Sequence, residues 1–127
     1  MLCLLKNEGG FKMQKNKYEL KGNCLVIHLE REIDHHYADR LREDTDKIIS
    51  KNFVKNIVFD FEGVDFMDSA GIGMIMGRYK KILHNGGQVL VSGVQKSVDR
   101  ILRMSGLYQI VERCDNVEAG MKQIEYR

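Results

Sequence analysis

The sequence has no proline and no tryptophan, and it contains no long hydrophobic run. Nothing in it approaches the roughly twenty consecutive apolar residues that a membrane-spanning helix needs, and the apolar start at 1–5 is too short for the core of a signal peptide. Repeats, low-complexity tracts and interdomain linkers are absent as well. These absences predict a single domain that stays in the cytoplasm and does not contact a membrane.

The chain also has no large excess of positive or negative charge. Its 20 basic and 18 acidic residues are spread along the chain and leave a formal net charge of +2. Lys12, Lys15 and Lys17 form a mild basic cluster but no polybasic tract. This pattern predicts a mixed, solvated surface and argues against direct nucleic-acid binding as the main activity.

Few residues are available for a disulfide framework or a metal site. The cysteines, Cys3, Cys24 and Cys114, are odd in number and share no CxxC spacing, which favours reduced thiols. His35 and His36 are adjacent, so on a helix they point about 100° apart, and no third ligand is spaced to join them. We therefore predict neither a metal nor a cofactor.

The chain is long enough for one compact domain with a real core, since it has 127 residues of which 43% are hydrophobic. Residues 1–16 carry no clear hydrophobic period and hold Gly9 and Gly10, so we interpret them as a flexible N-terminal extension. Met13 is a candidate for the natural start. The domain itself is expected over residues 17–127.

Hydrophobic periodicity predicts strands and helices in the order ββαβαβαβα. Two extended segments joined by Lys21-Gly22-Asn23 predict an antiparallel hairpin. The strands are expected at 18–20, 24–29, 56–61, 89–91 and 109–111, and the helices from Asp34 to about Ser50, over 72–83, around 98–102 and after Asp115. Asp34 and Asp115 are the expected caps. The order indicates an α/β fold with a mixed, mostly parallel sheet and helices packed over it.

The most informative stretch is VDFMDSAGIGMIMGRYKK at 64–81, where the central strand gives way to the second helix. Ser69 is therefore predicted at a helix N-terminus, where free amides and the helix dipole favour an anionic group. Gly71 and Gly73 keep the loop and first turn free of bulk, so that a partner backbone or a kinase can approach the hydroxyl. From these residues alone, a plain N-cap role for Ser69, or for Asp68 beside it, is the simpler interpretation.

The second helix also suggests a docking groove. The residues expected to face the core are Ile72, Ile75, Met76, Tyr79, Ile82 and Leu83. That assignment leaves Gly73, Met74, Gly77 and Lys81 on the outward side, with Arg78 on the charged outer face. An outward methionine beside two glycines is unusual, because glycine costs about 1 kcal/mol against alanine inside a helix. We hypothesise that a partner docks there.

Three motifs resemble those of STAS-domain anti-sigma factor antagonists, in particular the sporulation sigma-F type. FMDSAGIGMIMGRYK at 66–80 is similar to that family's phosphorylation-site loop and following helix. EIDHHYA at 32–38 resembles the start of the family's first helix, and RILRMSGL at 100–107 resembles the end of its third. The motifs occur in the family's order, and the resemblance covers the chain from about residue 17 onward.

The resemblance implies a STAS fold and a binding switch without enzymatic activity. The unphosphorylated antagonist would bind an anti-sigma factor that is also a serine kinase, with ATP bound to the kinase, and so free the sigma factor. A metal-dependent serine phosphatase would reverse the phosphorylation. By position Ser69 is the modified serine, and Ala70 stands where the sporulation protein has a second serine. The residues expected to meet the partner are Asp34, Asp68, Ser69, Ala70, Gly71, Gly73, Met74 and Gly77.

Other interpretations stay open. A serine hydrolase would use Ser69 as nucleophile, but the GxSxG elbow is missing and no acid is identified to orient a histidine. A receiver-like domain would be phosphorylated on Asp60 or Asp68 and would need a paired acidic cluster with a metal. Within the resembled family, an antagonist or scaffold of a general-stress pathway is the nearest alternative. The sequence does not define which sigma factor is controlled, and a monomer is the default expectation.

Overall fold

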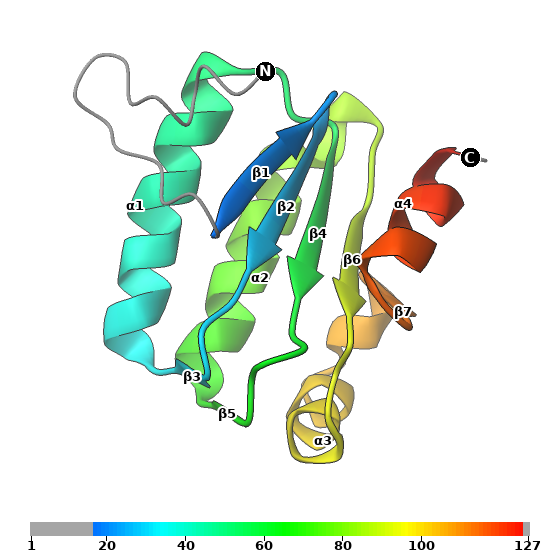
Figure 1. Cartoon of the computed structure of the whole chain (residues 1–127). Coiled ribbons are helices and arrows are strands. Elements are labelled where there is room, and N and C mark those ends of the chain that lie inside the picture. The colour runs from blue at the N-terminus through cyan, green and yellow to red at the C-terminus, as the bar shows by residue number, and fades with distance from the viewer. Residues whose placement is uncertain (1–16, 126–127) are drawn as a thin grey trace.

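A five-stranded sheet forms the centre of the domain (Figure 1). The computed structural model describes residues 17–125, so the predicted extension at 1–16 lies outside the described residues. The strands are β1 (Tyr18–Lys21), β2 (Cys24–His28), β4 (Asn56–Asp60), β6 (Val89–Ser92) and β7 (Glu112–Cys114), in the order β1-β2-β4-β6-β7. β1 and β2 are antiparallel, and the other neighbours are parallel. The predicted hairpin and mixed, mostly parallel sheet are confirmed.

Two additional short strands, β3 (Glu32–Ile33) and β5 (Phe66–Met67), form a separate parallel pair. Each has two residues, which is too short to show the alternation that identifies a strand in a sequence. They were therefore absent from the predicted element order, although they lie directly before the first two helices.

Four helices cover the two faces of the sheet. They are α1 (His35–Lys51), α2 (Ser69–Ile82), α3 (Lys96–Met104) and α4 (Val117–Glu125). The first three pack on one face, in a core that contains Leu41, Ile75 and Leu102, whereas α4 packs on the opposite face through Met121 and Ile124. Figure 1 shows α1 and α2 side by side behind the sheet and α4 well apart from them.

Alternation along the buried strands separates the two cores, because successive side chains of a strand point to opposite faces. Leu25 and Ile27 of β2 belong to the large core under α1, α2 and α3. Val26, between them, belongs to the smaller cluster under α4, together with Cys24 and Cys114. Both cysteines are buried free thiols, and burial raises the pKa of each to about 11. Cys24 and Cys114 are thus not joined to each other in this structure.

Two element ends differ from the prediction. Gly106, at φ 80, ends α3, and the 3-10 turn η4 (Leu107–Gln109) occupies the next residues, so the last strand starts later, at Glu112. The cap of α4 is Asn116, whose side-chain oxygen accepts a first-turn backbone N–H at 2.7 Å. Asp115, one position earlier, is therefore not the cap.

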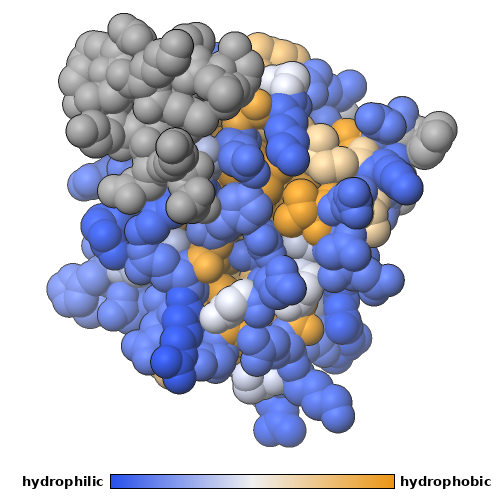
Figure 2. Space-filling view, viewed as in Figure 1, coloured by the Kyte–Doolittle hydropathy of each residue, from blue (hydrophilic) through white to orange (hydrophobic). Residues whose placement is uncertain are grey.

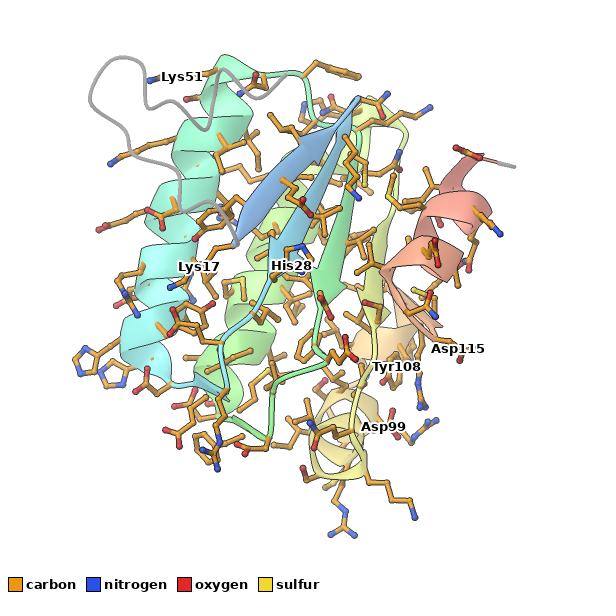
Figure 3. The ribbon with its side chains drawn as sticks, in the orientation of Figure 1. Lys17, His28, Lys51, Asp99, Tyr108 and Asp115 are labelled. Carbon is orange, nitrogen blue, oxygen red and sulfur yellow. The ribbon has the colours of Figure 1, made fainter. Side chains whose placement is uncertain are left out.

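His28 ties three strands together at the end of β2 (Figure 3). Its Nδ1 lies 2.7 Å from Asp60 Oδ2 of β4, and its Nε2 lies 2.8 Å from Glu19 Oε1 of β1. Burial alone would lower the pKa of His28, but the hydrogen bonds to the two carboxylates raise it above 6.5. The protonated ring can donate to both partners at once.

The surface is mixed, as the charge pattern predicts. Figure 2 shows hydrophilic residues over most of the coloured part of this face, with smaller hydrophobic patches between them. Within residues 17–125, none of the helices combines the length and apolar character that crossing a bilayer requires.

Candidate functional site

The short β3–β5 pair brings the starts of α1 and α2 together. Ile33 lies opposite Met67 in the parallel register, and the backbone N–H of Asp68 donates to the Ile33 carbonyl at 3.1 Å. Asp34 and Asp68 are the next residues of the two strands, so they occupy equivalent places before the two helices. This pairing places Asp34 at the same end of the two helices as the Ser69 loop.

Both aspartates cap a helix. Asp34 Oδ1 accepts the backbone N–H of Tyr37 at 2.9 Å, and Asp68 Oδ1 accepts that of Ala70 at 2.8 Å. The backbone hydrogen bond from Tyr37 lowers the pKa of Asp34. Asp68 is thus the cap of α2, and Ser69, which the sequence offered as an alternative cap, is the first helical residue.

Ser69 is exposed at the amino end of α2. An oxyanion on its hydroxyl would lie beside the first-turn amides and the positive end of the helix dipole. The carboxylates of Asp34 and Asp68 stand at the same end of the paired helices. The hydroxyl is therefore accessible to a modifying enzyme. A negative charge added there would interact directly with the first-turn amides and with the two carboxylates.

Gly71 is needed for close packing inside the domain and does not open the surface to a partner. It is buried, and a Cβ at this position would lie 2.5 Å from Met67 Cγ and Sδ and 3.2 Å from Ile33 Cγ2. The glycine lets α2 lie close against the β3–β5 pair. Its side of the helix faces the interior, so the expectation that Gly71 opens the loop to a partner is wrong.

Met74 is also on the inner side of α2, with 0% of its surface exposed. The residues predicted for the core include Met76 and Leu83, which are 38% and 52% exposed. The helix is thus rotated from the predicted orientation, and the outward Met74 is wrong. Apolar residues surround much of α2, so its hydrophobic pattern does not define a single inner face.

Arg78 explains part of this rotation. It was expected on the outer face, but it is only 4% exposed and sits between α1 and α2. Its guanidinium donates to Thr45 Oγ1 at 2.8 Å and to Asp46 Oδ1 at 2.6 Å, both on α1. Burial opposes ionisation of Asp46, but the hydrogen bond and charge of Arg78 lower its pKa. In the sequence, a buried polar contact at this place was indicated only by Thr45, a polar residue on the apolar stripe of α1.

The exposed side of α2 is a single stripe, which we call the Ser69 stripe. Its members are Ser69, Gly73, Met76, Lys80 and Lys81, with the half-buried Gly77 beside them, and the exposed Leu83 of the 3-10 turn η3 (Leu83–Asn85) continues it. A Cβ at Gly77 would meet nothing within 4 Å, and one at Gly73 would lie 3.5 Å from an Arg42 nitrogen. Gly73 and Lys81 are therefore exposed as expected and Gly77 is half-buried, but the exposed methionine is Met76 and not Met74.

The other candidates, the histidine pair and two aspartates, take part in local contacts. His35 and His36 are exposed with ring centroids 4.0 Å apart, and residues 17–125 contain no group of three side chains suited to a metal ion. Asp60 is held by His28, and Asp68 caps α2. The arrangement leaves an exposed serine hydroxyl at the amino end of α2.

Comparison with known proteins defines the class. The STAS domain model matches residues 15–120, and the chain belongs to the STAS domain family.

Particular relatives are regulators of sigma factors. The anti-sigma F factor antagonist of Paenibacillus polymyxa is 39% identical over 101 residues, which cover 80% of this chain and 86% of the relative. The anti-sigma-B factor antagonist of Bacillus subtilis (strain 168) is 25% identical over 100 residues, 79% and 90% of the two chains. The solved structure of the anti-sigma factor antagonist SpoIIAA in its unphosphorylated form has a TM-score of 0.79 and 25% identity, covering 87% of this chain and 96% of that one. The family expected from the three motifs is confirmed.

Proposed function

We propose that this protein is an anti-sigma factor antagonist that binds its anti-sigma factor while Ser69 is unphosphorylated and releases it once Ser69 carries phosphate. The observation that supports the proposal best is the exposed Ser69 at the first position of α2, directly after the capping Asp68. The names of the relatives supply the class of partner. The antagonist is a binding regulator in the cytoplasm and acts as a monomer.

The anti-sigma factor in this scheme is itself the serine kinase and holds the ATP. A metal-dependent serine phosphatase removes the phosphate, so the antagonist needs no metal or cofactor of its own. Identity favours control of a sigma-F-type factor, because the relative of that type is 39% identical and the sigma-B relative is 25% identical.

The partner contacts the amino ends of α1 and α2 and continues along the Ser69 stripe. Asp34, Asp68 and Ala70 border the serine, and Gly73 and Gly77 leave room for a close approach. Gly71 and Met74 are buried and support this surface from beneath without taking part in the contact.

Phosphorylation switches the surface by charge. A phosphoserine adds about 1.5 to 2 negative charges at neutral pH, next to Asp68 and Asp34. Two like charges 4 Å apart repel by about 1 to 4 kcal/mol between water-like and surface-like dielectric constants, and each 1.4 kcal/mol is about tenfold in affinity. An acidic or desolvated partner surface that meets this concentrated negative charge is repelled without any refolding of the domain.

The deciding experiment is phosphate transfer from ATP by the purified anti-sigma kinase, mapped by mass spectrometry. We expect label on Ser69 in the wild type and none in Ser69→Ala. Ser97 is a matched control, because it is an exposed serine in the first turn of α3. Ser97→Ala should be labelled like the wild type; label that persists in Ser69→Ala would contradict the assignment.

A further inference from the structure

A second surface stands apart from the Ser69 stripe, at the edge of the sheet formed by β7. A hollow of about 400 Å³ opens there between α3 and β7, lined by Arg103, Tyr108, Val111, Glu112 and Arg113. We call it the α3–β7 hollow. Figure 1 shows β7 at the far edge of the sheet from β1 and α1, and Figure 3 shows Asp99 and Tyr108 on that side.

Asp99 of α3 contacts three of the residues that line the hollow. It accepts a hydrogen bond from the Tyr108 hydroxyl at 2.5 Å, and it meets Arg103 at 3.2 Å and Arg113 at 3.1 Å. The hydrogen bond from Tyr108 and the two guanidinium groups lower the pKa of Asp99. One carboxylate therefore joins α3, η4 and β7 and orients both arginines.

The two guanidinium groups keep capacity for a further ligand. The side chains of Arg103 and Arg113 are 64% and 48% exposed, and each guanidinium has five N–H donors. Arg103 also lies over the Tyr108 ring, 5.3 Å from its centroid, which restricts its motion. Lys96 and Arg100 are exposed on the same helix, and Glu112 is the acidic residue among those that line the hollow.

β7 adds a backbone feature to this charge. It lies at the edge of the sheet, and within residues 17–125 its only strand partner is β6. Arg113 pairs with Val91 in the register, so its side chain points to the face covered by α3. A strand added outside β7 would place alternate side chains on that face, next to Arg113.

We propose that the α3–β7 hollow binds an acidic, extended segment of a partner protein, which adds as a strand to the outer edge of β7 and places its carboxylates against Arg103 and Arg113. Strand addition supplies affinity through main-chain hydrogen bonds, and alternate side chains supply specificity. The occupant is acidic because arginine forks bind carboxylates bidentately. This site is separate from the surface that binds the anti-sigma factor.

The test uses the full chain, labelled for NMR, and a short blocked peptide of alternating glutamate and threonine, a residue common in strands. We expect shifts of the β7 and α3 amides, with affinity that falls as salt rises. The same peptide with lysine in place of glutamate should not bind. Methylation of alternate peptide nitrogens should abolish binding without any change to the protein.

Arg113→Gln should weaken the glutamate peptide about tenfold, which corresponds to 1.4 kcal/mol. Arg40→Gln is the matched control, because the Arg40 guanidinium also lies over a tyrosine ring, 5.3 Å from the centroid of Tyr37, but on α1 and away from β7. It should bind like the wild type. Absence of shifts at millimolar peptide, equal binding of the lysine peptide, or shifts of arginine side chains without β7 amides would each overturn the proposal.

Discussion

The Ser69 stripe and the α3–β7 hollow both depend on carboxylates, but they use them in opposite ways. Asp34 and Asp68 accept backbone N–H groups at helix starts, so their negative charges remain at the surface beside the serine. Asp99 is surrounded by a tyrosine hydroxyl and two arginines, so positive charge remains outside it. In the proposed switch, phosphate on Ser69 would therefore add repulsion at the first surface and leave the second unchanged.

The two surfaces also differ in the burial of the arginine that lies at each of them. Arg78, beneath the Ser69 stripe, is 4% exposed, whereas Arg103 at the hollow is largely exposed. Arg78→Ala should lower the free energy of unfolding by about 3 kcal/mol, because it leaves a cavity and unpaired groups between α1 and α2. Arg103→Ala should cost less than about 1 kcal/mol. Urea unfolding measures both.

Arg78→Met serves as the control for that comparison, since an apolar side chain of similar length fills the space without a buried charge. It should recover most of the stability lost in Arg78→Ala. Equal losses in Arg78→Ala and Arg103→Ala would show that burial does not distinguish the two arginines.

Ser69→Asp sharpens the electrostatic contrast. Its charge should weaken binding to the anti-sigma factor about tenfold or more, because it adds repulsion beside Asp34 and Asp68. Binding of the glutamate peptide at the α3–β7 hollow should stay the same. Titration calorimetry of each ligand with the wild type, Ser69→Ala and Ser69→Asp tests both statements. If Ser69→Asp weakened both affinities in parallel, the two surfaces would not be independent binding sites.

Two glycines of α2 should respond with opposite signs. Gly71→Ala should destabilise the domain by about 1 to 3 kcal/mol, because the new Cβ would overlap the Met67 side chain. Gly77→Ala should stabilise it by about 0.5 to 1 kcal/mol, because nothing lies within 4 Å of the added atom. If the partner approaches closely, Gly77→Ala should still weaken the complex. Unchanged affinity in this more stable variant would remove Gly77 from the docking surface.

The smallest expected effect is on the stability of the domain at acidic pH. The folded pKa values of Asp34 and Asp99 are both lowered from 3.8, by a backbone N–H and by the Tyr108 hydroxyl respectively. Each carboxylate therefore contributes stability above its unfolded pKa, and this contribution disappears as the pH falls through the folded pKa. Urea unfolding at decreasing pH should show a shallower loss below 3.8 in Asp34→Asn, since asparagine still caps the helix. A curve identical to the wild type would contradict the assignment.

The order of the long elements could be predicted because their periods are clear, as in α1, where Tyr37, Leu41 and Ile48 are buried as expected. Ser69 could be placed at a helix start for the same reason. The orientation of α2 could not, since its apolar residues lie on several sides and a buried arginine occupies its inner face. The α3–β7 hollow also gave no signal, because Asp99 and Arg113 come from separate elements.

The sequence by itself determined the class of fold, the family and the position of Ser69 at a helix start, because periodicity and local motifs depend on residues close together in the chain. Tertiary structure alone decided which face of α2 is exposed, how the β3–β5 pair joins Asp34 to the Ser69 loop, and how one carboxylate orients two arginines. These features depend on packing and hydrogen bonds between distant segments, whose energies no local pattern records.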